Sequence, residues 1–225
     1  MKLPHEVPVM TLPHATLFPQ ALLPLFIFEP RYRQMLVDSL NSSRMFSVAM
    51  QKPGRKRETP SPIAGLGLIR VSVGHNDGTS HLILQGIARV ELVETVCYKP
   101  YRVQRIRPLE SPPCNGVVID ALLAKVRELM EDWARFDLPL PFPFSEAPNT
   151  KAKDKLAGFS ARQVLDYLDT LSDPEQVADM VSCAVLSGPF ERQTILETVN
   201  LEERLKYLVH FLMAEIARHR KDRHK

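Results

Sequence analysis

The sequence LPHATLFPQALLPLFIFEPRYR, residues 12–33, is the most distinctive stretch of the 225-residue chain. Its apolar part is interrupted by Pro19 and Pro24, is followed at once by charged residues, and shows no small-residue cleavage site. These features predict neither a signal peptide nor a membrane-spanning helix. Pro30 is typical of a first helical turn, so we expect a short helix to begin there.

Strand patterns surround this stretch up to about residue 110. Ile69, Val71 and Val73 alternate with polar residues, as in a strand with one solvated face. The Asp77-Gly78 pair that follows is typical of a hairpin turn, because both positions tolerate positive φ angles. The expected strands are residues 7–12, 45–50, 69–73, 82–84, 89–96 and 101–106, with close packing, a bend or a bulge at Gly65, Gly67 and Gly86.

After Ser111-Pro112-Pro113, the spacing of apolar residues changes to one that is typical of helices. Apolar residues then recur every three or four positions, and residues 138–149, with four prolines, predict an extended loop. The expected helices are residues 118–136, 160–168, 174–185, 193–199 and 200–216. The sequence therefore predicts an α+β chain with a β-rich subdomain at 1–112 and a helical bundle at 113–225 that ends in a basic tail.

Charge is unevenly distributed along the chain, whose formal net charge is +3. Residues 218–225 carry five lysines and arginines against one aspartate, so the remainder is close to neutral. This balance does not indicate a domain built around a nucleic acid. Two basic stretches nevertheless keep nucleic-acid binding open. Residues 52–57 form a basic loop, and residues 98–107 mix tyrosines with cations that can stack bases and hold phosphates.

Catalytic patterns are absent from the sequence. It contains no P-loop, no nucleophile elbow, no paired zinc-protease histidines and no dinucleotide fingerprint. Its histidines are scattered, and Cys97, Cys114 and Cys183 cannot all pair, which favours a reducing, cytoplasmic location. We therefore expect a protein without catalytic residues, metal or cofactor.

Several segments, taken in order, resemble the amino-terminal domain of Lon proteases. Residues 12–13 and 17–19 resemble the family's P-L-x-x-x-x-L-F-P run, and residues 23–32 resemble the pattern L-P-L-x-I-F-E-P-R-Y to which it leads. The further matching segments are residues 65–69, 77–78, 84–89, 100–101, 106–110, 177–180, 193, 196–197 and 203–205. The resemblance implies a stand-alone Lon substrate-binding domain that lacks the ATPase and protease modules, with a PUA-like pseudo-barrel followed by a helical bundle.

The resemblance also implies a function. It suggests a non-catalytic module that binds exposed hydrophobic segments of unfolded or client polypeptides. Phe18, Phe28 and Tyr32 lie in the matching motif, so we expect them to line a peptide-binding groove. Arg31 and Arg89 would hold a backbone carbonyl or an acidic residue. The alternative is that all five residues are structural, with both phenylalanines in the barrel core.

Two other functions stay open at this point. A PUA-like fold is compatible with RNA or DNA binding through the basic stretches. The last helix is apolar more than halfway round at residues 207–213, so the chain could also be an adaptor that docks on a separate protease, or it could self-associate, through that helix. No membrane partner is expected.

Overall fold

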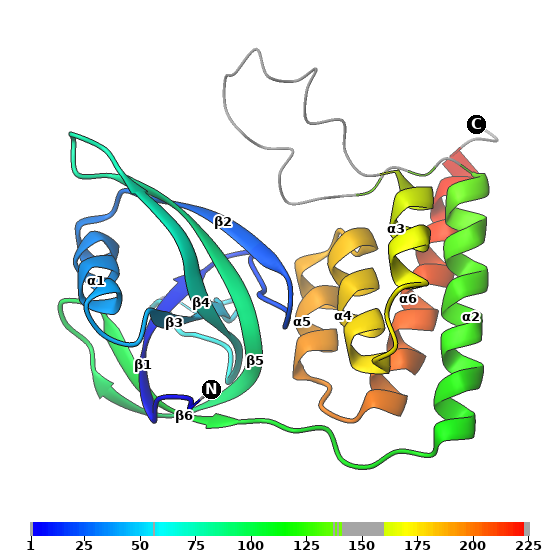
Figure 1. Cartoon of the computed structure of the whole chain (residues 1–225), viewed down its shortest axis with the longest axis horizontal. Coiled ribbons are helices and arrows are strands. Elements are labelled where there is room, and N and C mark those ends of the chain that lie inside the picture. Colours follow the sequence, from blue (N-terminus) through cyan, green and yellow to red (C-terminus); the bar gives the residue numbers. More distant parts are fainter. Residues whose placement is uncertain (1, 56, 137, 139, 141–159, 223–225) are drawn as a thin grey trace. The chain divides into compact units, whose positions relative to one another are not determined.

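The computed structural model describes residues 2–55, 57–136, 138, 140 and 160–222. The chain forms two compact units, Met1–Glu110 and Ser111–Lys225, and each is described by itself below. The first unit contains the strands and one helix, and the second contains helices (Figure 1). The predicted α+β class, with strands before helices, is confirmed.

The first unit is a closed barrel with one additional strand. Its elements are β1 (Glu6–Leu12), β2 (Leu22–Ile27), α1 (Pro30–Leu40), β3 (Met45–Met50), β4 (Ile63–Gly74), β5 (Ser80–Cys97) and β6 (Arg102–Pro108). The sheet order is β2-β5-β4-β3-β1-β6, and β5 also pairs with β6, which closes the ring. Only β1 and β3 are parallel. Closure removes the free edges of the ring strands, whereas β2 remains outside on the first half of β5.

The connection between β1 and β2 crosses the barrel strands at glycines. A Cβ atom on Gly65 of β4 would lie 2.0 Å from the Leu17 carbonyl oxygen, and one on Gly86 of β5 would lie 2.0 Å from the Phe18 carbonyl oxygen. The Gly86 N–H donates to the Ala21 carbonyl, and Gly86 accepts from the Gln20 N–H, both at 2.9 Å. The predicted close approach at these glycines is confirmed, and it fixes where β2 begins.

The helix α1 packs its apolar face on the barrel. Tyr32, Met35 and Leu36 are buried in one cluster with core residues from β1, β3 and β5. The Tyr32 hydroxyl accepts from the Thr11 N–H at 3.2 Å and donates to the Thr11 carbonyl at 3.3 Å. Burial raises the pKa of Tyr32. The helix predicted to begin at Pro30 is therefore confirmed, and the Tyr32 hydroxyl anchors it to β1.

The second unit is a helical bundle. Its helices are α2 (Gly116–Arg135), α3 (Ala161–Leu168), α4 (Pro174–Val185), α5 (Pro189–Glu197) and α6 (Leu201–Asp222). The predicted capping box at Ser160 is present, because its hydroxyl accepts from the Gln163 N–H while the Gln163 side chain accepts from the Ser160 N–H. Among the described helices, none is both long and apolar enough to cross a bilayer.

Several elements differ from those expected from the sequence, including β4, which begins at Ile63 rather than at Ile69. The strand β2 was not predicted, because both of its faces are apolar and the alternation that marks a strand is lost. The segments expected at 82–84 and 89–96 form one continuous strand, β5. Helix α5 begins at Pro189 rather than at Gln193, because proline is accommodated at the first helical position. The loop predicted at 138–149 lies mostly outside the described residues.

A buried arginine connects several parts of the helical unit. Arg204 of α6 is fully buried. Its guanidinium donates to the carbonyls of Thr198 (2.8 Å) and Val199 (2.8 Å), to Ser111 Oγ (3.2 Å) and to Glu175 Oε2 (3.4 Å), and lies 3.7 Å from Asp179 Oδ1. These contacts join the start of the unit, α4 and the turn before α6. Two of the three charged residues in these contacts, Asp179 and Arg204, lie in segments that resemble the Lon pattern.

Because the backbone at Leu17-Phe18 crosses β5 in close contact with Gly86, a single methyl group added at this glycine should lower stability strongly. Gly86→Ala places a Cβ against the Phe18 backbone, which cannot move aside as a side chain can. We expect a loss of about 1–3 kcal/mol in unfolding free energy, as for other overpacked sites. Gly74→Ala is the control, since its Cβ would meet only Ser80 Oγ at 3.9 Å. Thermal unfolding followed by circular dichroism compares them, and equal melting temperatures would contradict the crossing.

Loss of the Arg204 guanidinium should destabilise the helical unit. Arg204→Met removes the cation that faces Glu175 and the buried Asp179, so we expect a cost of about 3–5 kcal/mol. Arg127→Met removes an exposed ion pair with Asp169 and should cost less than about 1 kcal/mol. Trp133, the single tryptophan, is buried in α2 and reports urea unfolding of this unit by fluorescence. Similar midpoints for both variants would argue against the role of Arg204.

Candidate polypeptide-binding site

The five residues proposed from the sequence do not form one surface. Phe18 is fully buried, and Tyr32 and Arg89 are each only 4% exposed. Phe28, by contrast, is 59% exposed, and the Arg31 side chain is partly exposed. Phe18 and Tyr32 are therefore buried, and of the aromatic residues proposed, Phe28 is the one that a ligand can reach.

The charge of Arg31 is already neutralised within the molecule. Its Nε donates to Glu29 at 2.9 Å and its Nη1 donates to Glu58 at 2.6 Å. The guanidinium also lies over the Tyr32 ring, 4.4 Å from the centroid. Burial tends to lower the pKa of Arg31, but its hydrogen bonds to the two glutamates outweigh burial and raise the pKa. This arginine holds the start of α1 to the loop that carries Glu58.

A contiguous apolar surface that was not predicted from the sequence lies on the outer side of β2, β5 and β4. Alternate residues of a strand face opposite sides, so the side chains between the buried ones point to solvent. Cross-strand register places Phe26 beside His81 and His81 beside Val73, and Pro24 beside Ile83 and Ile83 beside Val71. We call this surface the outer apolar face. It consists of Leu22, Pro24, Phe26, Phe28, Val71, Val73 and Ile83, all of which are exposed.

Aromatic rings gather at one end of the outer apolar face. Phe26 is 49% exposed and stacks on Phe28 with ring centroids 5.9 Å apart. The His81 ring lies 4.7 Å from Phe26, and His75 meets His81 edge-on with 2.7 Å between His75 Nε2 and His81 Nδ1. The stacking keeps the two phenylalanines side by side on the surface. Such a platform can cover an apolar side chain of a partner.

The exposed edge of β2 is less suited to binding than its face. The Gly86 N–H donates to the Ala21 carbonyl, so the backbone carbonyl of Ala21 faces β5. Along an antiparallel ladder, residues that bond the neighbouring strand alternate with residues whose backbone groups face away from it. Leu22, Pro24 and Phe26 therefore direct their backbone groups to the free edge. Pro24 has no N–H to offer, and proline on an edge strand discourages the pairing of a further strand. Contact with a polypeptide is consequently expected through side chains of the face.

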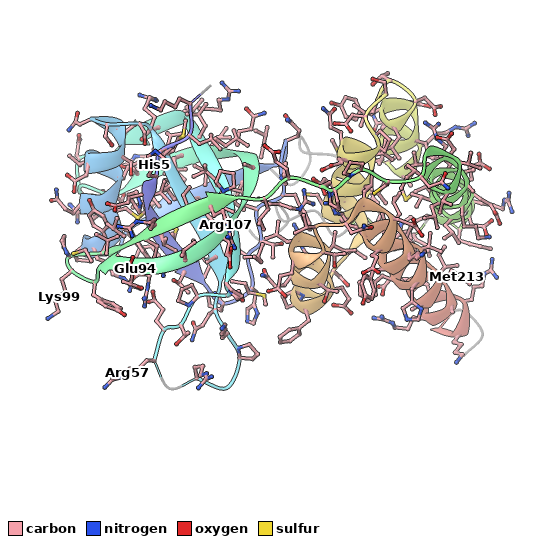
Figure 2. The ribbon with its side chains drawn as sticks, turned by 90° about the horizontal axis from the view of Figure 1, so that it is seen from below. His5, Arg57, Glu94, Lys99, Arg107 and Met213 are labelled. Atoms are coloured by element: carbon pink, nitrogen blue, oxygen red, sulfur yellow. The ribbon has the colours of Figure 1, made fainter. Side chains whose placement is uncertain are left out.

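The basic strand considered for nucleic-acid binding carries mostly paired charges. Arg105 of β6 donates to Glu94 at 2.7 Å and to Glu6 at 3.3 Å, and Arg107 donates to Glu91. Figure 2 labels Glu94 and Arg107 on this pair of strands. Arg102 donates to the Glu58 carbonyl and lies over the Tyr98 ring. These contacts reduce the positive charge available to phosphates on this strand.

The tyrosine of the same strand is also engaged. Tyr101 donates to Asp38 of α1 at 2.6 Å. Burial, together with this hydrogen bond, raises the pKa of Tyr101 to about 12. Its ring is half-buried against the apolar cluster that contains α1. Stacking of a base on Tyr101 would therefore require the ring to leave this position. In the other basic stretch, 52–57, residue 56 lies outside the described part of the chain.

Comparison with known proteins gives one consistent family. The model of the ATP-dependent protease La (LON) substrate-binding domain matches residues 6–214. The chain is 23% identical over 217 residues to a Lon protease of Dictyoglomus thermophilum, covering 95% of this chain and 25% of that protein. It is 24% identical over 223 residues to Lon protease 2 of Thermus thermophilus, covering 96% and 25%. The chain spans about a quarter of the length of these curated relatives.

Solved structures support the same fold. The N-terminal domain of Mycobacterium avium complex Lon protease superimposes with a TM-score of 0.69 at 17% identity, covering 92% of this chain and 98% of that one. A Lon N-terminal domain protein from Xanthomonas campestris gives a TM-score of 0.51 at 20% identity, with the same coverage. At these identities the likeness establishes the fold alone.

The different positions of the two motif phenylalanines predict different effects of truncation. Phe18→Ala removes a fully buried ring and should cost about 3–5 kcal/mol of unfolding free energy. Phe28→Ala removes a ring that is largely in solvent and should change stability by no more than about 0.5 kcal/mol. Urea unfolding followed by circular dichroism measures both. A large loss for Phe28→Ala would show that this ring is structural and would remove it from the outer apolar face.

Proposed function

The chain belongs to the family of the ATP-dependent protease La (LON) substrate-binding domain, and from this we propose that it is a non-catalytic module that binds exposed hydrophobic segments of unfolded or client polypeptides. The matched part of its relatives is the substrate-binding domain, so a substrate-binding module is the general function of the family. The preference for hydrophobic segments and a cytoplasmic location are our proposals.

The outer apolar face is the main support for binding of hydrophobic segments. Soluble proteins seldom expose a contiguous apolar surface, and such surfaces commonly bind other proteins. Here three adjacent strands present seven exposed apolar residues, two of them stacked phenylalanines. Complete burial of one such side chain contributes about 1.5–3 kcal/mol, part of which offsets the entropy lost on association. A few anchors of this kind support weak, reversible binding, which suits a module that samples many sequences.

Two alternatives receive less support from the molecule. Nucleic-acid binding would use the arginines of β6, which are largely paired with glutamates. Docking of this chain, as an adaptor, on a separate protease or its self-association would use α6, where Tyr207 and Met213 are the large apolar side chains exposed among the described residues of that helix. Figure 2 labels Met213. The leucines of α6 are buried in its own unit.

Substitution on the outer apolar face tests the proposal. The double variant Phe26→Ser/Phe28→Ser should weaken binding of a fluorescein-labelled, reduced and carboxymethylated polypeptide by about tenfold or more, because two anchors are lost. Phe190→Ser on α5 is the matched control, since Phe190 is exposed to the same extent at 58%. Fluorescence anisotropy at about 50 and about 300 mM salt should show little salt dependence for wild-type protein.

The opposite results are equally informative. Equal weakening by Phe190→Ser would remove the outer apolar face as the binding surface. Binding to single-stranded RNA alone, lost at the higher salt, would replace the proposal by a nucleic-acid function. Binding to neither probe would contradict a general affinity for hydrophobic segments.

A further inference from the structure

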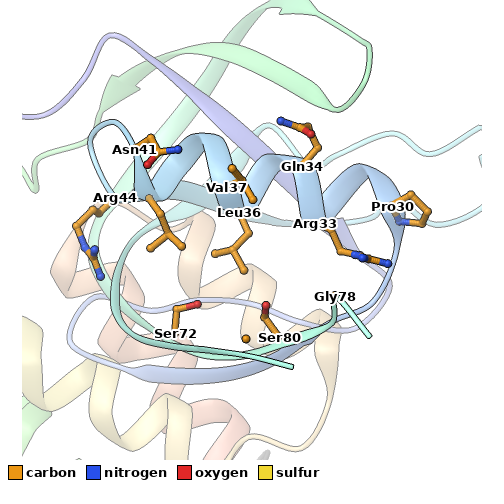
Figure 3. A pocket seen from close by; sticks show the side chains of 12 residues that line it. Pro30, Arg33, Gln34, Leu36, Val37, Asn41, Arg44, Ser72, Gly78 and Ser80 are labelled. Atoms are coloured by element: carbon orange, nitrogen blue, oxygen red, sulfur yellow. The ribbon is translucent and has the colours of Figure 1, made fainter. Parts of the chain in front are cut away.

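The hairpin of β4 and β5 has a second surface opposite the outer apolar face. Val71 and Val73 point to the outer side, so Ser72 and Gly74 point to the other, as does Ser80 beside Gly74. This other side lies across an open groove from α1, as Figure 3 shows. The groove has a volume of about 1060 Å³. A volume of this size accommodates several residues of a peptide.

The groove has an apolar middle and a cation at each end. Leu36, Val37 and Leu40 lie along α1 between Arg33 and Arg44 (Figure 3). The complete lining is Pro30, Arg33, Gln34, Leu36, Val37, Leu40, Asn41, Arg44, Ser72, Gly74, Gly78 and Ser80. These residues include no carboxylate and no aromatic ring. The groove therefore presents positive charge, hydrogen-bonding amides and hydroxyls, and aliphatic surface together.

The guanidinium of Arg33 is positioned without a counter-charge. The side chain is half-buried, and it makes no ion pair with any residue in the described part of the chain. It lies against Gly78, where a Cβ atom would be 1.7 Å from Arg33 Nη2. The nearby Asp77 carboxylate accepts instead from the N–H and the hydroxyl of Thr79. The turn glycine thus makes room for a cation that forms no ion pair with the residues that the structure describes, 2–55, 57–136, 138, 140 and 160–222.

The other end of the groove is also cationic. Arg44 follows α1 with a positive φ of 58° and is exposed. Its Nη2 donates to the Ile69 carbonyl at 3.4 Å, a long contact that leaves other guanidinium donors for a ligand. The carboxylate of α1, Asp38, does not line the groove and accepts from Tyr101 and Gln34. Both ends of the groove therefore favour an anionic ligand.

We propose that this groove binds an extended polypeptide segment with an aliphatic middle and a carboxylate near each end. This inference rests on the proposed function and names a second class of segment for it. The carboxylates would pair with Arg33 and Arg44, and aliphatic side chains would cover the exposed Val37 and the partly buried Leu40, beside which Leu36 is buried. The eleven residues of α1 span about 16 Å, which about five residues of extended chain match. The lining contains no aromatic ring of the kind on which successive bases stack in single-strand-binding proteins.

Short labelled peptides test the ligand class on the unaltered protein. Fluorescence anisotropy compares a hexapeptide ELVALE, labelled through a glycine spacer, with QLVALQ and KLVALK. We expect the acidic peptide to bind about tenfold or more tightly than the glutamine peptide, and its affinity to fall with salt, because two charge-assisted pairs are at stake. Equal affinities for ELVALE and QLVALQ would overturn the proposal, whatever any variant does.

Variants then locate the site. Arg33→Gln and Arg44→Gln should each weaken ELVALE binding about five- to tenfold. Arg70→Gln makes the same change of charge at an exposed arginine outside the groove and should leave binding unchanged. Equal weakening by Arg70→Gln would reduce the effect to net charge and overturn the groove as the site. Tighter binding of a short RNA, blocked by the same two variants, would assign the groove to nucleic acid instead.

The failure of this inference can be distinguished from failure of the proposed function. Phe26→Ser/Phe28→Ser should keep the wild-type preference for ELVALE over QLVALQ, because neither residue lines the groove. Binding of the carboxymethylated polypeptide through the outer apolar face, with no selectivity for ELVALE, would overturn the groove proposal alone. Selective ELVALE binding that depends on Arg33, with no polypeptide binding that depends on Phe26 and Phe28, would overturn the hydrophobic-segment proposal and keep the groove.

Discussion

The close contact between the backbone at Leu17-Phe18 and the glycines of β4 and β5 is the constraint on which the barrel unit depends. It brings the chain across the strands at a distance that no larger residue permits. The hydrogen bonds of Gly86 then set the register of β2 on β5. That register decides which of the residues 22–28 enter the core and which face solvent. The outer apolar face is therefore a consequence of where this crossing lies.

The β4–β5 hairpin connects fold and function, because its two sides differ in chemistry. One side continues the apolar surface of β2, and the other lines the groove beside α1. Gly78 contributes to both the hairpin and the groove. It forms the turn with a positive φ angle, and its missing side chain leaves space for Arg33. A module that meets varied polypeptides gains from two such surfaces. We propose that one binds aromatic and aliphatic side chains and that the other binds acidic ends.

Much of the fold could be predicted from the sequence, whereas the site could not. The hairpin at Asp77-Gly78, the capping box at Ser160 and the helix at Pro30 were predictable because each depends on local chemistry. The motif resemblance identified the right segment but could not separate Phe18 from Phe28, since strand parity and a tertiary crossing decide which ring is buried. The groove was missed because Arg33 and Gly78 meet only in the folded chain.

Backbone hydrogen exchange tests the central claim that polypeptides bind on the outer apolar face. The amides of β2, β4 and β5 would be followed with and without a saturating amount of the carboxymethylated polypeptide. The account predicts added protection at residues 22–28 and in the first half of β5, with little change in β6 and α6. Protection confined to β6, or to α6, would contradict it and place the binding surface elsewhere.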